Sequence, residues 1–366
     1  MPDSVRWLHQ FAGSPRFGFV RRDGTGLLGV GIAESVTGES IAHVLADCER
    51  RGGTWFVGGS FDPRRERDAW WKPFGAAQAW RADTTVSLPS HASSTQTTTP
   101  TMALRERGPA LGRYPDRAEW KRLVEQVISG IQAGIGDKVV LARSIVEATQ
   151  TDAVTWLHGP RRPREMAFVF EPEPGVAFAG LTPELLYDRH GDTVRSEALA
   201  GTDVDTADGR ARLLASDKDA LEHGLVVQAV TDALTPLCTS LNPSPLQLAA
   251  TGRLVHRLVT FEGRLTKDVG DAMLAESLHP TPAVAGTPKR AAVGYLRHNE
   301  PFDRGWYAGP IGLVEPGRTT LSVALRCALW LGSTRISYAG AGIVAGSKAE
   351  AEWDETELKS RAVRDR

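Results

Sequence analysis

The sequence predicts an α+β fold, a sandwich of large antiparallel or mixed sheets flanked by helices. Consecutive segments of strand pattern, interrupted by blocks of helical pattern, are the main observation behind this prediction. The second is the length of 366 residues, which exceeds what one ordinary core serves and favours one large or two fused subdomains. The third is a composition of 41% hydrophobic and 24% charged residues, which is typical of a soluble globular protein.

Residues 1–86 are expected to form an N-terminal β-rich subdomain. Their segment RFGFVRRDGTGLLGVGIAE alternates in hydropathy and turns at Asp23–Gly24, which indicates a hairpin. The segment TWFVGGSFD indicates a further strand. Residues 87–112 begin with a Ser/Thr-rich stretch without apolar period, so we expect an exposed loop or linker there. The region 113–366 carries the candidate site and is expected to pack with 1–86 as one globule.

The region 113–366 alternates between helix and strand patterns. Asp116 is a candidate N-cap of a helix whose apolar residues recur at helical spacing until Gly134. The segment DKVVLARSIVEA indicates a strand. The segment VAFAGLTPELLYDRHGDTVRSEALAGT indicates a strand, a turn at Thr182–Pro183 and a hairpin at Gly191–Asp192.

The segments that follow predict one long helix, four strands and a final helix. The long helix is expected in DGRARLLASDKDALEHGLVVQAVTDALTPL, and RLVHRLVTFEGRL then alternates like a strand. Three further strands, with Gly-rich turns between them, are expected in WYAGPIGLVEP, TTLSVALRCALWL and TRISYAGAGIV. The final helix contains AEAEWDETELK.

Charge and composition exclude several classes of protein. The formal net charge of −1 argues against a general nucleic-acid binder. No apolar run is long enough to predict a transmembrane helix, and MPDSVRWLHQFAGSPRF lacks the apolar core of a signal peptide. Cys48, Cys238 and Cys327 lie far apart and the histidines are dispersed, which argues against structural zinc. We therefore expect a reduced, cytoplasmic protein that binds neither nucleic acid nor membrane.

Two acidic pairs are the strongest candidates for a metal site. Asp219 and Glu222 lie at i and i+3 of one predicted helix, and Glu352 and Glu355 repeat this spacing in another. Hard oxygen ligands without histidine or cysteine suit Mg²⁺. The alternative is two solvated acidic helix faces, which spacing alone favours. The apolar residues that flank each pair, such as Trp353, favour an inward orientation.

Other residues are candidates for substrate binding and proton transfer. Gly340 and Gly342 follow a strand, where free backbone N–H groups could hold a carboxylate or phosphate, or only form a turn. Arg326, within an apolar strand, is either an anion receptor or a side chain that reaches solvent at a strand end. Lys138 is an exposed lysine or a base with a lowered pKa. Glu184, after a Pro turn, could be a general acid in a partly apolar pocket.

Eight segments, in order between residues 115 and 360, resemble those of the chorismate-utilising enzymes, and among them the isochorismate synthases. The segments are KVVLAR, TPELL, EALAGT, SDKDALEHGLVV, LHPTPAVAGTPKRAA, EPFDRGWYAGPIG, LRCA and AGAGIVAGSKAEAEWDETELK. The resemblance implies stacked large sheets with the active site between them, and one Mg²⁺ ion that binds the ring carboxylate of chorismate. The chain departs from the family pattern at Thr182, where many relatives have Ser, and at Gly224, where close relatives often have Glu.

The resemblance also implies a role for each matched residue. Glu222 and Glu355 would ligate the metal directly and Asp219 and Glu352 through water, Lys138 would activate water, and Glu184 would be the general acid. The substrate-binding positions implied are Arg326 and Tyr307 for the enolpyruvyl carboxylate, Gly201, Thr202, Gly340 and Gly342 as donors, His256 lining the site, and Lys359 near the metal carboxylates.

The reaction implied is addition of water at C2 of chorismate with loss of the C4 hydroxyl, which gives isochorismate. The alternative is a salicylate synthase, which also eliminates pyruvate, although the segment 279–283 (HPTPA) favours stopping at isochorismate. An ammonia-using relative and a non-catalytic anion-binding relative are further alternatives, and intact Lys138 and Glu184 argue against the second. We expect a monomer whose partner is the small molecule chorismate. The pathway, menaquinone or siderophore biosynthesis, stays open.

Overall fold

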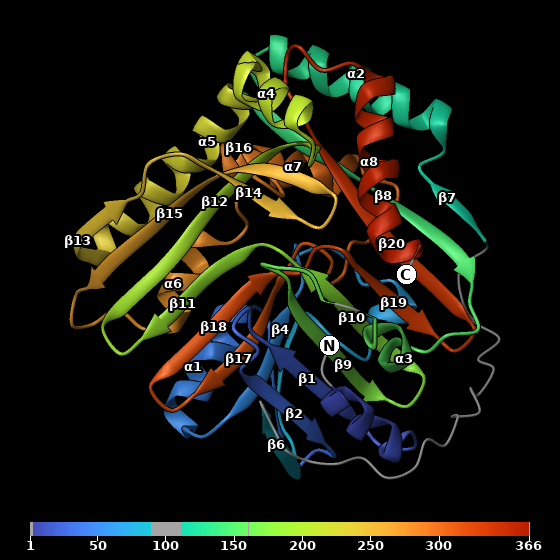
Figure 1. The fold of residues 1–366 in the computed structure, drawn as a ribbon, viewed down its shortest axis with the longest axis vertical. Helices are drawn as coiled ribbons and strands as arrows, with labels where there is room; N and C mark the ends of the chain where they lie inside the picture. Colours follow the sequence, from blue (N-terminus) through green and yellow to red (C-terminus); the bar gives the residue numbers. More distant parts are fainter. Residues whose placement is uncertain (1–2, 89–110, 160, 366) are drawn as a thin grey trace.

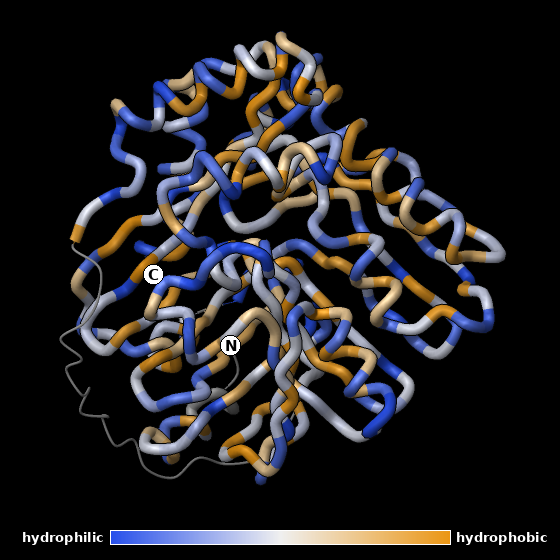
Figure 2. Tube along the Cα trace, turned by 180° about the vertical axis from the view of Figure 1, so that it is seen from behind, coloured by the Kyte–Doolittle hydropathy of each residue, from blue (hydrophilic) through white to orange (hydrophobic). Residues whose placement is uncertain are grey.

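The computed structural model describes residues 3–88, 111–159 and 161–365. Within these residues the strands form two ten-stranded sheets, and every pair of neighbouring strands for which a register is defined is antiparallel (Figure 1). The predicted fold class, large antiparallel sheets flanked by helices, is therefore confirmed. Figure 2 shows hydrophobic and hydrophilic positions interleaved along the strands and helices, as expected for elements with one buried face.

The first sheet, sheet A, contains strands from distant parts of the sequence. Its strands are β1 (Arg16–Val20), β2 (Gly26–Val30), β6 (Thr84–Leu88), β7 (Gly112–Tyr114), β8 (Lys138–Ala148), β9 (Met166–Glu173), β10 (Val176–Thr182), β16 (Gly286–Thr287), β19 (Cys327–Leu331) and β20 (Thr334–Ile343). Their order is β16-β8-β20-β19-β10-β9-β1-β2-β6, and β7 also pairs with β8.

The second sheet, sheet B, is assembled in the same way. Its strands are β3 (Glu34–Gly38), β4 (Trp55–Gly59), β5 (Ala77–Arg81), β11 (Leu185–His190), β12 (Thr193–Val204), β13 (Cys238–Pro243), β14 (Gln247–Thr251), β15 (Leu254–Leu265), β17 (Pro310–Glu315) and β18 (Arg318–Val323). Their order is β13-β15-β12-β11-β18-β17-β4-β5-β3, and β14 pairs with β15.

The helices cover the outer faces and ends of the two sheets (Figure 1). The α-helices are α1 (Ile41–Arg51), α2 (Arg117–Gln132), α3 (Ala153–Leu157), α4 (Ala207–Ala215), α5 (Asp217–Leu234), α6 (Asp271–Leu278), α7 (Lys289–Asn299) and α8 (Ala349–Arg364). Three 3₁₀ helices are η1 (Asp3–Phe11), η2 (Ala69–Trp71) and η3 (Thr235–Leu237).

Aromatic side chains from strands of sheet A and sheet B pack against one another. The strands that carry them, β1, β4 and β9, lie in the lower half of Figure 1. Phe17 of β1 in sheet A stacks on Phe56 of β4 in sheet B, with ring centroids 5.6 Å apart. Phe170 of β9 contacts both rings edge-on. Burying large aromatic rings removes much apolar area from water, so this cluster holds the sheets together.

Both sheets combine strands from before and after the predicted linker. β1 pairs with β9 in sheet A, and β4 pairs with β17 in sheet B. The predicted linker, 87–112, lies largely outside the described residues, although β6 and β7 extend into its two ends. The division into an N-terminal subdomain, a linker and a catalytic region stays a prediction.

Several local predictions are confirmed. The turn at Asp23–Gly24 joins β1 and β2 as an antiparallel hairpin. Asp116 caps α2 by accepting a hydrogen bond from the backbone N–H of Glu119. The predicted strand, Pro turn and hairpin correspond to β10, β11 and β12.

Three local predictions are wrong. Gly340 and Gly342 do not follow a strand but lie within β20, where they pair with β8. The predicted long helix is two helices, α4 and α5, because Ser216 adopts an extended conformation and its hydroxyl caps α5 at the N–H of Asp219. The predicted strand TTLSVALRCALWL is also two strands, β18 and β19, which belong to different sheets. Arg326 lies between them with φ of 47°, outside any strand, in a conformation that few residues other than glycine adopt.

Candidate active site

Lys138 and Glu222 form the centre of the candidate site. Lys138 is the first residue of β8 and its side chain is fully buried. Its Nζ atom lies 2.9 Å from Oε1 of Glu222, which projects from α5. A Cβ atom at Gly342, on the neighbouring strand β20, would lie 2.7 Å from both Glu222 Oε1 and Lys138 Cε. Only glycine therefore leaves room for this ion pair.

The ion pair fixes the charge of Glu222. Burial by itself would raise the pKa of Glu222, but the Lys138 ammonium at hydrogen-bond distance holds that pKa below its usual value. The Glu222 carboxylate is therefore ionised at neutral pH and is bound to the Lys138 ammonium. Removing Lys138 would leave Glu222 without this partner.

Glu184 lies in a different electrostatic environment. It follows Pro183 in the turn between β10 and β11, and only 3% of its surface is exposed. Burial raises the pKa of Glu184 to about 7, although the Thr281 hydroxyl donates a hydrogen bond to Oε1 at 3.2 Å. The charge of Lys138 acts on the same carboxyl and opposes the rise. Glu184 can therefore carry a proton at neutral pH, as a general acid must.

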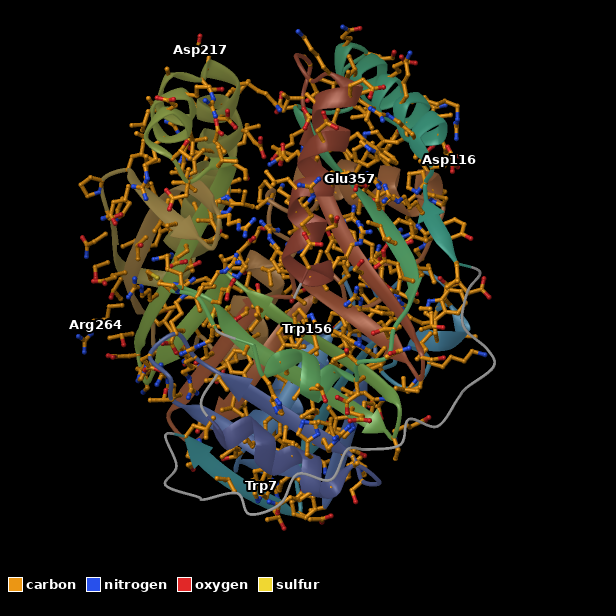
Figure 3. The ribbon with its side chains drawn as sticks, turned by 45° about the vertical axis from the view of Figure 1, so that its right-hand side comes forward. Trp7, Asp116, Trp156, Asp217, Arg264 and Glu357 are labelled. Carbon is orange, nitrogen blue, oxygen red and sulfur yellow. The ribbon has the colours of Figure 1, made fainter. Side chains whose placement is uncertain are left out.

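The helices α5 and α8 place the two acidic pairs near one another. Figure 3 shows α5, whose first residue Asp217 is labelled, and α8, which carries Glu357, both in the upper half of the molecule. Lys218 of α5 bridges to Glu352 of α8 at 2.7 Å, and Lys359 pairs with Glu355 within α8 at 2.5 Å. The predicted inward orientation holds for Glu352, which is 1% exposed.

Mutual repulsion among these carboxylates is visible in their pKa values. Burial raises the pKa of Asp219, and the charges of Glu222 and Glu355 raise it further. Burial and the Glu355 charge raise the pKa of Glu352 despite its bond to Lys218. Oxygen Oε2 of Glu352 is buried and has no hydrogen-bond partner within the described part of the chain. A cation would relieve both effects.

The donor set fits a hard divalent cation in its chemistry. Within residues 3–88, 111–159 and 161–365, no three His, Cys, Asp or Glu side chains converge closely enough to hold a metal ion. The ammonium groups of three lysines lie among the carboxylates instead, on Glu222, Glu352 and Glu355. A Mg²⁺ ion bound here would therefore displace lysine contacts from Glu222 and Glu355.

Arg326 has the features of an anion receptor. Its guanidinium is half-buried, and burial lowers the pKa of Arg326. It takes part in no ion pair or side-chain hydrogen bond with the described residues. A partly desolvated guanidinium without a partner attracts a carboxylate strongly.

Tyr307, Gly340 and Lys359 form one wall of the site. A Cβ atom at Gly340 would lie 3.0 Å from the Tyr307 hydroxyl, so the two residues are in close contact. Tyr307 stacks on Tyr338 with ring centroids 5.0 Å apart. Lys359 donates a hydrogen bond to the carbonyl of Gly340 at 3.0 Å, which ties α8 to β20.

Gly201, Thr202 and His256 form a second wall. Nδ1 of His256 lies 3.0 Å from the carbonyl of Gly201, which can only accept, so this nitrogen carries the proton. The Thr202 hydroxyl lies 3.0 Å from the same nitrogen, and the Thr251 hydroxyl lies 2.7 Å from Nε2. Burial lowers the pKa of His256 to about 3, so its ring is neutral. Gly201 has φ of 69°, which glycine adopts without strain.

Sequence reasoning missed three residues that support the predicted ones. Thr281, which donates a hydrogen bond to Glu184, lies inside the matched segment LHPTPAVAGTPKRAA. The segment could therefore have drawn attention to Thr281, but nothing in the sequence indicates that Glu184 is its partner. Lys218 lies beside Asp219 in the sequence, yet its partner Glu352 is 134 positions away. Thr251 had no signal, because β14 was not predicted.

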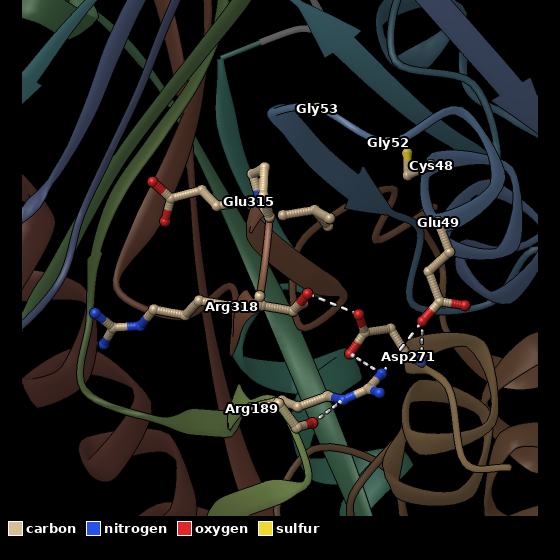
Figure 4. A pocket seen from close by; sticks show the side chains of 13 residues that line it. Cys48, Glu49, Gly52, Gly53, Arg189, Asp271, Glu315 and Arg318 are labelled. Atoms are coloured by element: carbon tan, nitrogen blue, oxygen red, sulfur yellow. Dashed lines mark hydrogen bonds and ion pairs between the residues drawn. The ribbon is translucent and has the colours of Figure 1, made fainter. Parts of the chain in front are cut away.

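Two cavities differ in their relation to this site. One, of about 410 Å³, is lined by Arg326, by Pro183 next to Glu184 and by Thr251 next to His256. The other, of about 260 Å³, is drawn in Figure 4 and is lined by residues such as Glu49, Arg189 and Asp271. None of the predicted site residues lines the second cavity, where Arg189 is paired with both Glu49 and Asp271.

None of the described helices combines the length and the apolar character needed to cross a membrane.

Comparisons with known proteins agree with the motif resemblance. Residues 78–365 match the family model described as chorismate binding enzyme. A chloroplastic isochorismate synthase of Catharanthus roseus is 36% identical over 261 residues, which cover 67% of this chain and 45% of the relative. This chain thus spans about half the length of that relative.

Two further comparisons cover a larger share of the similar protein. The salicylate biosynthesis isochorismate synthase of Pseudomonas aeruginosa is 33% identical over 344 residues, which cover 83% of this chain and 72% of the relative. The solved structure of MenF, the menaquinone-specific isochorismate synthase of Escherichia coli, has a TM-score of 0.79 and 27% identity. It covers 99% of this chain and 90% of the MenF chain, so the fold is shared along nearly the whole length.

Proposed function

Because the chain belongs to the chorismate binding enzymes, we propose that it isomerises chorismate to isochorismate with Mg²⁺ as its cofactor. The observation that carries this proposal is a buried carboxyl with a pKa of about 7, Glu184, on which the charge of a buried lysine, Lys138, acts. Lys138 supplies the base and Glu184 the acid. A monomeric state and a cytoplasmic location are further parts of the proposal.

The proposed reaction moves a hydroxyl group without a net change of atoms. Lys138 takes a proton from water, and the resulting hydroxide bonds to C2 of the ring. The ring double bonds shift, and the bond between C4 and its hydroxyl breaks. Glu184 gives its proton to the departing hydroxyl, which leaves as water.

The ion pair with Glu222 controls when Lys138 can act. Lys138 can take a proton from water only as a neutral amine, so its ammonium must lose a proton and its ion pair with Glu222 must open before the chemical step. One Mg²⁺ ion, held by Glu222 and Glu355 directly and by Asp219 and Glu352 through water, would neutralise these carboxylates and bind the ring carboxylate. Lys359 then remains bonded to the Gly340 carbonyl.

The other candidate residues orient the substrate. Arg326 and Tyr307 would hold the enolpyruvyl carboxylate, because an unpaired guanidinium and a buried hydroxyl can both bind one carboxylate. The Thr202 hydroxyl and the backbone of Gly201 and Gly342 offer further polar contacts. Fixing both ends of chorismate between the base and the acid lowers the entropic part of the barrier.

The direct test is incubation of the protein with chorismate and Mg²⁺, followed by chromatographic separation of the products. The expected result is isochorismate as the main product. Salicylate would be followed by its fluorescence in the same time course. Salicylate that forms faster than isochorismate decays in buffer would assign the chain to the salicylate synthases, and absence of any turnover would overturn the proposal.

A further inference from the structure

The cavity of about 410 Å³ beside the site is lined by an unusual number of arginines. They come from separate elements that meet at its rim: the segment after α3, the β14–β15 turn, the β18–β19 connection and α8. The four are Arg162, Arg253, Arg326 and Arg361. The carboxylates that line the same cavity are those of Glu165 and Asp365. The lining therefore carries two more positive than negative groups.

Three of these arginines are available to a ligand. Arg162, Arg253 and Arg361 are exposed, and their side chains form no ion pair with the described residues. Some exposed arginines, such as Arg212, are paired with carboxylates, and others, such as Arg64 and Arg290, are in no ion pair with the described residues. The three cavity arginines differ from the latter because they line one concave wall together. Unpaired guanidinium groups around a concave wall create a positive potential that extends into the cavity.

The guanidinium of Arg162 lies against the β14–β15 turn. Gly252 in this turn has φ of 73°, and a Cβ atom there would lie 2.1 Å from Nη1 of Arg162. Gly252 thus permits the backbone conformation of the turn and leaves space for the guanidinium of Arg162. The preceding residue, Thr251, lines the cavity and contacts His256 of the candidate site. The cavity is therefore adjacent to the candidate site, and Pro183, the neighbour of Glu184 in the sequence, also lines it.

We propose that this cavity is an entry chamber for a dianionic dicarboxylate, in which Arg162, Arg253 and Arg361 capture the substrate before it binds Arg326. The proposal rests on the proposed function, because chorismate carries two carboxylates. The excess of two positive groups in the lining complements these two charges. The three arginines are selectivity and capture residues, and they take no part in proton transfer.

The test compares two triple variants with the same change of charge. In one, Arg162, Arg253 and Arg361 are each replaced by glutamine. In the control, the exposed residues Arg64, Arg290 and Lys267, none of which lines this cavity, are replaced by glutamine. For both, kcat and kcat/KM for chorismate are measured at several salt concentrations, and chorismate binding is measured by calorimetry.

We expect kcat/KM of the cavity variant to fall about tenfold or more at low salt, while kcat stays within about twofold. Its kcat/KM should also depend less on salt than that of the wild type, because screening acts on the charges that were removed. Equal kcat/KM and equal salt dependence in the two triple variants would overturn the entry chamber and leave the proposed function intact. Salt-dependent chorismate binding that is weakened only in the cavity variant, without turnover by the wild type, would support the chamber and overturn the function.

Discussion

Replacing Glu184 with glutamine is expected to abolish turnover and, at high pH, to stabilise the protein. Glutamine has nearly the shape of a protonated glutamate but no proton to give, so it removes the general acid. The pKa of Glu184 is raised from 4.5 to about 7 by burial. A folded protein with such a carboxyl binds the proton more tightly than the unfolded chain does. The associated stability is complete below pH 4.5 and is lost as the pH rises through about 7.

The size of the effect follows from the two pKa values. Between pH 5 and pH 8 the wild type should lose about 2 kcal/mol of unfolding free energy through this group alone. The glutamine variant carries no ionisable group at this position and does not incur this loss. Its free energy of unfolding should therefore rise relative to that of the wild type by about 2 kcal/mol over the same interval.

The assay is chemical denaturation of both proteins at pH 5 and pH 8. Substitution of the exposed Glu66 by glutamine serves as the control and should show a difference that hardly changes with pH. A difference between wild type and Glu184→Gln that is the same at both pH values would refute a raised pKa at Glu184. It would also remove the main argument for this residue as the acid.

Three further variants and conditions test the rest of the site. Lys138→Ala should abolish turnover while chorismate still binds in calorimetry, and near-wild-type turnover at neutral pH would show that another group is the base. Turnover should stop in excess EDTA and return when Mg²⁺ is added, and full turnover in EDTA would contradict a metal requirement. The variants Glu222→Gln and Glu355→Gln should be inactive even with Mg²⁺, although circular dichroism should show that they are folded. Gly342→Ala should lower kcat at least about tenfold, because its Cβ would lie 2.7 Å from the Lys138–Glu222 pair, whereas Gly346→Ala, with no atom within 4 Å, should be neutral. Equal kcat in these two alanine variants would mean that the close approach at Gly342 does not matter.

Local patterns predicted much of the fold. The alternation around Asp23–Gly24 and the cap at Asp116 depend on neighbouring residues, and both were read correctly from the sequence. The break at Ser216 was missed, because the helical pattern continues across it and only the backbone conformation of one residue separates α4 from α5. The assignment of β18 and β19 to different sheets could not be predicted, since hydropathy does not tell which sheet a buried strand joins.

In the candidate site, too, a relation between residues close in the sequence could be predicted, whereas contacts between residues far apart in the sequence could not. Helical spacing grouped Asp219 with Glu222. The pairing of Lys138 with Glu222 joins residues 84 positions apart and has no local signature. The motif resemblance identified both residues and implied a role for each, but it did not predict that they contact one another. The lysine partners of the carboxylates emerged from the structure.

The interleaving of distant strands has a consequence for how the protein folds. Arg16 of β1 bonds Glu171 of β9 across 155 positions, and β4 pairs with β17, which is still farther along the chain. Contacts of this kind require large loops to close first, so folding should be slow and should pass through partly ordered intermediates. During synthesis, β1 and β4 leave the ribosome shortly before β2 and β5, with which they also pair, but long before β9 and β17 exist. Their unpaired edges would then be the main sites of misassociation, and chaperone binding to nascent chains should be greatest before β17 emerges.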